Sequence, residues 1–399
     1  MKVVVAGAGI GGLVTALQLH HRGIGCVVYE RGDHLRELGV GINLLPHAVA
    51  ELAALGLLDE LDRIAVRTEE LIYAHRLGPE ILRRPCGLAA GLDQPQFSVH
   101  RGRLRGMLLR AVRDRLGPHA VRTGCPVTGF TQSNHTVAVT LSDGRAARCD
   151  ALVAADGIHS TVRHLLYPDE GPPRWNGITM WRGATDWPGF GTGRSVLIAG
   201  GTPAKFVAYP IAPDSALTNW AVCVATGRDG DPPPMRQDWS RQADPARVRG
   251  ALRRFRTPLV DHTALVAATA EVFEFPMCDR DPLPRWTFGR VTLLGDAAHP
   301  MFPMGSNGAG QAILDATALA ESLAGHADVA EALVAYEDER LPVTADIVQR
   351  NRTGGPEGVI DLVEQRAPDG FERLSDVADP AELDAIVTGY TQASRRLSR

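Results

Sequence analysis

Three glycines near the start of the chain have the spacing of a nucleotide-binding turn. The run Gly7-Ala8-Gly9-Ile10-Gly11-Gly12 follows the apolar residues 3–6 and precedes a helical pattern over residues 13–22. Such a turn lets the backbone approach a pyrophosphate closely, and the helix start directs free N–H groups at that charge. Glu30 ends the next strand, residues 26–30, where it can accept hydrogen bonds from a ribose diol. The alternative, a glycine-rich turn without a ligand, does not account for the spacing of Glu30.

A second motif, Gly295-Asp296-Ala297-Ala298-His299-Pro300, lies almost a whole chain later. Asp296 follows the apolar residues 291–294, and a carboxylate at the carboxyl end of a parallel strand faces the ligand crevice. The glycine-rich run 305–310 then opens a helix that continues to Leu323, and its N-terminus suits negative charge at the edge of a reduced flavin. Taken alone, this run is equally compatible with an ordinary helix cap. A long cofactor held from both ends of the sequence indicates FAD.

Three other positions have two interpretations each. Asp156-Gly157 follows the apolar residues 151–155 and forms either a simple turn or a second contact to the dinucleotide. Arg101 opens a helical pattern over 101–116, where it either clamps phosphate or ribityl oxygens or is a solvated surface charge. His299, beside Asp296, is a candidate acid–base residue, but its place in a tight turn also suits a structural or flavin-lining role.

Several classes of site lack support. The chain has no Gly-x-Ser-x-Gly elbow, no His-Glu-x-x-His pair and no P-loop. The motifs of these serine hydrolases, metalloproteases and ATPases are therefore absent from the sequence. Its six cysteines are scattered without a Cys-x-x-Cys pair, which argues against a metal site and a disulfide framework and fits a reducing cytoplasm. The net charge of −4 shows no nucleic-acid footprint. No apolar run has membrane-spanning length, and the first strand, starting at Lys2, leaves no room for a signal peptide.

The pattern of elements predicts an α/β fold in which a β-rich domain is inserted into a Rossmann-like one. Buried-strand patterns at 3–6, 26–30, 151–155 and 291–294 indicate a parallel sheet. We expect a helix over 46–65, hairpins over 71–84 and 137–149, and a surface excursion at the proline-rich residues 229–245. The predicted FAD-binding domain comprises residues 1–70, 97–167 and 284–350. The β-rich substrate domain comprises 71–96 and 168–283, and residues 351–399 form a C-terminal helical segment.

The three motifs, in this order, resemble those of the single-component aromatic flavoprotein monooxygenases of the para-hydroxybenzoate hydroxylase type over about residues 1–350. Within that family, residues 39–44, 98–102, 177–183 and 279–284 are most similar to phenazine hydroxylases of the pyocyanin pathway. Salicylate and 3-hydroxybenzoate hydroxylases come next. The loop 229–245 and the residues after 356 have no match in this resemblance.

The resemblance implies a monooxygenase that uses FAD, NADPH or NADH, and O₂ to hydroxylate an aromatic or N-heteroaromatic substrate. Oxygen transfer would proceed through a flavin C4a-hydroperoxide, with or without loss of CO₂, in secondary metabolism or aromatic breakdown. It implies catalytic roles for Tyr209, Pro303 and His299 and a substrate pocket that includes Leu45, Trp181 and Met304. The cofactor contacts it implies are Gly7, Gly9, Ile10, Gly11, Gly12, Glu30, Arg31, Gly41, Arg101, Val127, Asp156, Gly157, Asp296, Asn307, Gly308 and Ala309.

Alternatives remain open for the pocket and for the activity. Tyr209 is equally suited to a core position, Trp181 leans towards core packing, and Arg182 towards an internal salt bridge rather than a substrate carboxylate. A flavin-dependent epoxidase or dehydrogenase would share the same scaffold. A non-catalytic dinucleotide-binding protein would share the first motif but would not need the second. The expected assembly is a monomer or homodimer.

Overall fold

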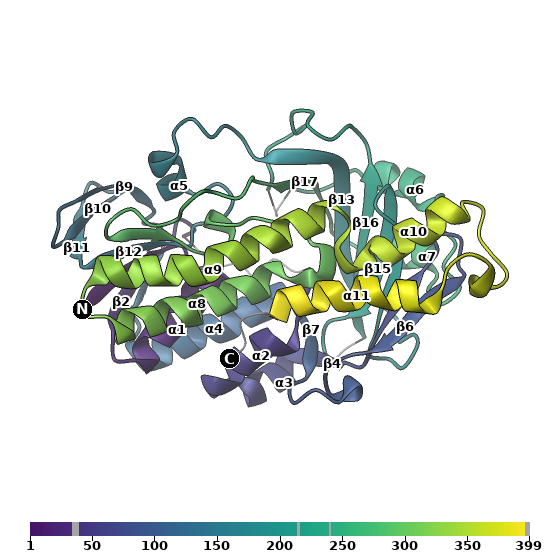
Figure 1. The fold of residues 1–399 in the computed structure, drawn as a ribbon, viewed down its shortest axis with the longest axis horizontal. Helices are drawn as coiled ribbons and strands as arrows, with labels where there is room; N and C mark the ends of the chain where they lie inside the picture. The colour runs from purple at the N-terminus through teal and green to yellow at the C-terminus, as the bar shows by residue number, and fades with distance from the viewer. Residues whose placement is uncertain (34–39, 214–215, 239–240, 396–399) are drawn as a thin grey trace.

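The computed structural model describes residues 1–33, 40–213, 216–238 and 241–395. It confirms the predicted α/β fold, with a parallel sheet towards one end of the molecule and a larger, mainly antiparallel sheet towards the other (Figure 1). Gly39 of the run 39–44, and Trp239 and Ser240 of the loop 229–245, lie outside the described residues.

The parallel sheet has five strands in the order β18-β12-β1-β2-β8. Val3, Val4 and Val5 are fully buried, as expected for a strand covered on both faces. The carboxyl ends are level, because Ala6 pairs with Ala154, which pairs with Leu293. The residues that follow three of these strands therefore meet at one edge. The strands are β1 (Lys2–Ala6), β2 (Gly25–Tyr29), β8 (Val121–Arg122), β12 (Ala151–Ala154) and β18 (Val291–Leu293).

Helices cover this sheet. Helix α1 packs against α4 and α8, and α8 packs against α9, so segments from both halves of the sequence lie together (Figure 1). Their apolar faces join the strands in one hydrophobic core. The helices of this part are α1 (Ile10–His21), α2 (Pro46–Ala54), α3 (Leu58–Ile64), α4 (Arg101–Leu116), α5 (Thr161–Leu166), α8 (Gly308–Gly325) and α9 (Val329–Arg352).

The larger sheet has seven strands in the order β17-β13-β16-β15-β14-β5-β6. Helices α6 (Pro245–Leu252) and α7 (His262–Ala267) pack on one face through a core that contains Phe206, Trp220 and Phe255. Part of the other face lines a cavity. The strands are β5 (Glu70–Ala74), β6 (Glu80–Pro85), β13 (Arg174–Asp186), β14 (Ser195–Ala199), β15 (Ala204–Pro210), β16 (Leu217–Ala225) and β17 (Val272–Asp279).

Two three-stranded sheets, in the orders β11-β10-β9 and β3-β7-β4, complete the strands. The second of these lies between the two larger sheets, because β3 contacts both α8 and β16. The strands are β3 (Gly41–Leu44), β4 (Ala65–Thr68), β7 (Gln96–His100), β9 (Val127–Gln132), β10 (Val137–Leu141) and β11 (Ala146–Cys149).

The C-terminal segment runs back across the larger sheet, where α10 contacts β5 and β6 and α11 packs against α10 (yellow in Figure 1). Val359, Ile360 and Leu383 are buried with Tyr73 and Val196 of that sheet. The elements are the 3-10 turn η4 (Gly355–Glu357), α10 (Gly358–Arg366), the turn η5 (Leu374–Asp376) and α11 (Pro380–Arg395).

Two local expectations need correction. The single helix expected over 46–65 is two helices, α2 and α3, because Gly56 between them has a φ of +71° that a helix cannot contain. The loop 229–245 is more than a surface excursion, since Arg236 and Gln237 line the main cavity. The hairpins are confirmed as β5/β6 and β10/β11, the latter with Gly144 at a φ of +82°.

Candidate active site

One large cavity, of about 1250 Å³, lies between the carboxyl edge of the parallel sheet and the face of the larger sheet opposite α6 and α7. Most of the residues singled out from the sequence line it. They are Gly7, Gly9, Ile10, Gly11, Glu30, Arg31, Gly41, Leu45, Arg101, Val127, Asp156, Gly157, Tyr209, Asp296, Pro303, Met304, Gly308 and Ala309. Gly12, Trp181, His299 and Asn307 do not line it. The cavity therefore joins both ends of the sequence in one space.

The glycine turn forms a cradle that side chains would fill. Gly7 has a φ of +100°, and a Cβ there would lie 2.4 Å from the carbonyl oxygen of Ala155. A Cβ on Gly12 would lie 2.0 Å from the carbonyl oxygen of Gly7, so Gly12 closes the turn from behind. A Cβ on Gly9 would meet nothing within 4 Å, which leaves room for a ligand at the start of α1. This geometry fits the pyrophosphate of a dinucleotide.

Glu30 is held by the backbone around this turn. Its carboxylate accepts hydrogen bonds from the N–H groups of Ala8 (2.7 Å) and Gly32 (2.9 Å). Arg105 lies 3.7 Å from the same carboxylate and donates from Nε to the carbonyl oxygen of Ala8 (2.8 Å). Sequence reasoning missed Arg105, although its position four residues after Arg101 places both side chains on one face of α4.

The carboxylate of Asp156 has one oxygen engaged and one available to a ligand. One carboxylate oxygen accepts from the N–H of Thr161 (2.8 Å) at the start of α5. The other, Oδ1, is buried and has no hydrogen-bond partner within the described part of the chain. Burial raises the pKa of Asp156, although hydrogen bonds from Ser160 and the nearby backbone oppose the shift. A buried acceptor without a partner fits a hydroxyl group of the cofactor.

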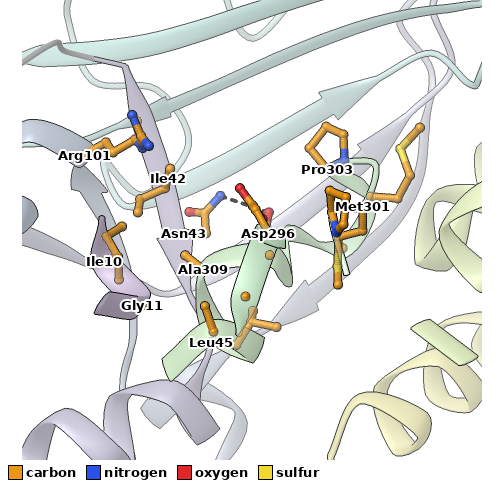
Figure 2. A pocket seen from close by; sticks show the side chains of 18 of the residues that line it. Ile10, Gly11, Ile42, Asn43, Leu45, Arg101, Asp296, Met301, Pro303 and Ala309 are labelled. Atoms are coloured by element: carbon orange, nitrogen blue, oxygen red, sulfur yellow. Dashed lines mark hydrogen bonds between the residues drawn. The ribbon is translucent and has the colours of Figure 1, made fainter. Parts of the chain in front are cut away.

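Asp296 belongs to the 3-10 turn η2 (Gly295–Ala297) directly after β18, and its side chain is exposed to the cavity. Figure 2 shows it at the centre of the cavity wall, with Arg101 on one side and Pro303 on the other. Its position deep in the protein raises the pKa of its carboxyl, and the charges of His299 and Arg101 oppose that shift. Burial of Arg101 lowers the pKa of its guanidinium, and the charge of Asp296 opposes that shift.

The loop after Asp296 has an unusual backbone. Ser306, in the 3-10 turn η3 (Met304–Ser306), has a φ of +56° and is the only non-glycine with a positive φ among the described residues. Asn43 donates from Nδ2 to its hydroxyl (3.4 Å, dashed in Figure 2), a contact that the sequence did not indicate. Asn307 is fully buried behind the loop and donates to the hydroxyl of Tyr390 (3.0 Å).

The larger sheet supplies an apolar wall with polar groups set into it. Met180, Val207 and Phe275 face the cavity. Arg182 also faces it and donates to the carbonyl oxygen of Gly41 and to Asn219 Oδ1 (3.4 Å). Among the described residues, Arg182 forms hydrogen bonds but no salt bridge, so the expectation of an internal salt bridge is wrong. Tyr209 is buried beside Arg182, and burial raises the pKa of its hydroxyl more than Arg182 lowers it.

Trp181 and His299 lie elsewhere. Side chains alternate along β13, so Trp181 points away from the cavity into the core, with Arg247 5.7 Å above its ring. His299 is buried under the cofactor edge, where Nε2 lies 2.5 Å from Asp315. Burial would raise the pKa of Asp315, but the charges of His299 and Arg340 outweigh it and lower that pKa. This arrangement suits a packing role for both residues rather than contact with a substrate.

Three further observations concern the described residues as a whole. No three His, Cys, Asp or Glu side chains gather among them where they could hold a metal ion. All six cysteines are free thiols. Within the same described ranges, no helix has the length and apolar character needed to cross a membrane.

The substitution Tyr209→Phe tests the polar part of this wall. It keeps the buried ring and removes the hydroxyl next to Arg182. We expect FAD to stay bound, while substrate affinity or the ratio of product to hydrogen peroxide changes by roughly two- to tenfold, the worth of one hydrogen bond. Substrate titration and a peroxide assay measure both quantities. Wild-type values for both would remove Tyr209 from the site.

The chain matches known proteins along most of its length. Residues 1–351 match the family described as FAD binding domain. The phenazine 1,6-dicarboxylic acid hydroxylase of Lysobacter antibioticus is 43% identical over 369 residues, 88% of this chain and 89% of the relative. The 3-hydroxybenzoate 6-hydroxylase 1 of Aquipseudomonas alcaligenes is 32% identical, over 88% of each chain. Among solved structures, Klebsiella pneumoniae HpxO complexed with FAD and uric acid superposes with a TM-score of 0.75 at 25% identity, covering 99% of this chain and 92% of that one.

These matches confirm the resemblance found in the sequence motifs and the FAD cofactor. They also remove the alternative of a non-catalytic dinucleotide-binding protein, since the relatives named are hydroxylases. The chain belongs to the FAD binding domain family and is an FAD-dependent aromatic monooxygenase that consumes NAD(P)H.

Proposed function

We propose that the enzyme hydroxylates a carboxylated N-heteroaromatic substrate of about phenazine size at the carbon that bears the carboxylate. The observation that carries this proposal is a pair of buried arginine nitrogens at the cavity. Within the described residues, Arg84 Nη1 and Arg182 Nε have no hydrogen-bond partner, and both side chains line the cavity. A buried guanidinium donor without a partner is costly and suits an anionic ligand.

The surroundings of Arg84 support a substrate carboxylate there. Arg84 lies on β6, the edge strand of the larger sheet, rather than near the cofactor turn. Its one carboxylate contact within the described chain is Asp384 at 3.1 Å, and the Asp384 side chain is 58% exposed. An exposed partner contributes little, so Arg84 keeps charge available for a ligand. The relative from Lysobacter antibioticus is named for a substrate with two carboxylates.

The protein residues contribute placement and exclusion of water. When bound, FAD would accept a hydride from NAD(P)H and would then supply the transfer of one oxygen atom of O₂ to the aromatic ring. The apolar wall of Met180, Val207 and Phe275 excludes water from the ring, and Arg84 and Arg182 fix its carboxylates. The ring carbon gains a C–O bond and loses its bond to the carboxylate, which leaves as CO₂. The second oxygen atom leaves as water, with the hydride of NAD(P)H and two protons balancing the reaction.

The residue roles and domain boundaries expected from the sequence form part of this proposal. Residues 1–70, 97–167 and 284–350 would hold FAD, with Glu30, Arg101, Asp156 and Asp296 as its polar contacts. Residues 71–96 and 168–283 would form the substrate wall, and 351–399 would close it. We also propose a cytoplasmic monomer or homodimer, and the six free thiols support a reducing compartment. Light scattering of the purified enzyme measures the oligomeric state.

The direct test supplies phenazine-1,6-dicarboxylate, phenazine-1-carboxylate and 3-hydroxybenzoate to the FAD-loaded enzyme. We expect the phenazine carboxylates to stimulate NAD(P)H oxidation most, with one ¹⁸O from ¹⁸O₂ in the product and one CO₂ released. Hydroxylation of 3-hydroxybenzoate alone would replace the substrate assignment. Unlabelled product would indicate a dehydrogenase, and a labelled epoxide would indicate an epoxidase.

Arg84→Met isolates the proposed anion contact. Loss of a hydrogen-bonded charge of this kind costs about 1.5–3 kcal/mol, which would raise KM for a carboxylated substrate roughly 10- to 150-fold. Arg83→Met is the matched control. Arg83 is the neighbour of Arg84 on β6, does not line the cavity, and pairs with Glu70 (2.9 Å) and Glu80 (2.7 Å) at the surface. Equal KM values in the two variants would exclude Arg84 as the anchor.

A further inference from the structure

The C-terminal segment contributes part of the cavity wall, although the matched family residues end at 351. Glu357 of the turn η4 and Tyr390 of α11 both line the cavity. Both are buried, each with 6% exposure. They come from elements that carry no motif, and they contact the loop 304–307 that follows the second glycine motif.

That loop has a conformation that an L-amino acid adopts at a cost. Gly305 has a φ of +62°, and the next residue, Ser306, has a φ of +56°. A serine in the left-handed region is strained and persists only where its surroundings hold it. Asn43 reaches the Ser306 hydroxyl at 3.4 Å, which is a weak contact. Stronger contacts must therefore fix the backbone on either side.

Glu357 holds one side of the strained pair. Its Oε1 accepts a hydrogen bond from the backbone N–H of Gly305 (3.2 Å). Its Oε2 forms a buried ion pair with Lys205, whose Nζ also lies 3.0 Å from Met304 Sδ. Burial alone would lower the pKa of Lys205, but Glu357 outweighs it and the pKa is raised. The charge on Lys205 thus keeps the Glu357 carboxylate in place beneath the loop.

Tyr390 holds the other side. Its hydroxyl proton is shared between Asn351 Oδ1 (2.6 Å) and the carbonyl oxygen of Met304 (3.1 Å), and its oxygen accepts from Asn307 Nδ2 (3.0 Å). Its ring also covers Gly305, where a Cβ would lie 2.5 Å from ring atom Cε1. Burial holds the pKa of Tyr390 far above its usual value, so the hydroxyl remains a donor at working pH.

We propose that Glu357 and Tyr390 are positioning residues that hold the loop 304–307 in the shape in which it meets the flavin ring. The C-terminal segment then determines how much NAD(P)H oxidation is coupled to hydroxylation. This proposal rests on the proposed function and on the flavin edge lying against the start of α8, as expected from the glycine-rich run 305–310. It does not depend on which aromatic compound is the substrate.

The test compares FAD-loaded Tyr390→Phe with Tyr167→Phe. The control also loses one tyrosine hydroxyl bond to a carbonyl oxygen, that of Arg285 (2.8 Å), and Tyr167 does not line the cavity. In Tyr390→Phe we expect FAD affinity to stay within about twofold, while the coupled fraction falls roughly threefold or more, because the contacts of the hydroxyl with Asn351, Met304 and Asn307 are lost. We also expect a changed flavin absorption spectrum without substrate and faster amide exchange in residues 304–307. Tyr167→Phe should change none of these.

Glu357→Gln provides a second variant, in which the amide hydrogen of Gly305 should exchange faster than in the wild type. A folded variant of either kind with wild-type spectrum, exchange and coupling would overturn the proposal. Loss of FAD from either variant would also overturn it, because the segment would then retain the cofactor rather than position the loop. The spectrum and exchange are measured without substrate. A wild-type spectrum and wild-type exchange would therefore contradict the role of the C-terminal segment whether or not the substrate assignment is right.

Discussion

Asp296→Ala is expected to release FAD from the enzyme at concentrations where the wild type stays yellow. Asp296 follows β18 at the carboxyl edge of the parallel sheet, and its side chain opens into the cavity opposite Arg101 (Figure 2). Loss of the hydrogen bonds that this carboxylate would accept from the cofactor costs about 2–3 kcal/mol, which weakens FAD binding roughly 30- to 150-fold. Titration of the FAD-free protein with FAD, followed by flavin fluorescence, measures this change.

Asp296→Asn is the matched control for shape. It retains a carbonyl acceptor of the same size and loses the charge that lies opposite Arg101. Its FAD affinity should therefore fall between those of the wild type and the alanine variant. An alanine variant with wild-type affinity would show that the carboxylate does not contact FAD.

The second large effect is expected from Gly12→Ala, which should destabilise the fold even without FAD. Alanine normally stabilises a helix over glycine by about 1 kcal/mol. Here its Cβ would lie 2.0 Å from the Gly7 carbonyl oxygen, a backbone atom that cannot move without opening the turn. We expect a net loss of about 3 kcal/mol in the free energy of unfolding, measured by urea denaturation of the FAD-free chain.

Gly9→Ala separates binding from folding in the same turn. Gly9 has a φ of −72°, and its Cβ would meet no protein atom within 4 Å. The FAD-free variant should therefore unfold at the wild-type urea concentration. The new methyl group would occupy the space where the pyrophosphate approaches, so FAD affinity should fall. Equal stabilities of the two alanine variants without FAD would contradict this account of the turn.

The sequence predicted those parts of the site that depend on local order along the chain. Gly7, Glu30, Asp156 and Asp296 each follow a buried parallel strand, and level strand ends place them at one edge. The β-like runs of residues 168–283 also predicted that this region is rich in strands. The sequence did not show which face of each strand meets the cavity, because that depends on what packs on the other face. Trp181 was therefore predicted in the pocket, whereas its neighbours Met180 and Arg182 line it.

Other parts depend on contacts between distant segments that carry no motif. Arg84 is an ordinary polar position on an edge strand until the larger sheet forms. Glu357 lies in the turn η4 and Tyr390 in α11, neither of which carries a motif, and only the return of the C-terminal segment across the sheet brings them to the loop 304–307. His299 was ambiguous because a histidine in a tight turn does not reveal that Asp315, on α8, lies below it.

The order of strands in the parallel sheet has a consequence for biosynthesis. Strand β1 leaves the ribosome about 290 residues before β18, Asp296 and the start of α8. At 5–20 residues per second this interval is roughly 15–60 s. The nascent chain holds half of a dinucleotide site throughout that time. Vitamin-derived cofactor is therefore captured late, and riboflavin starvation should leave completed but empty polypeptides rather than stalled ones.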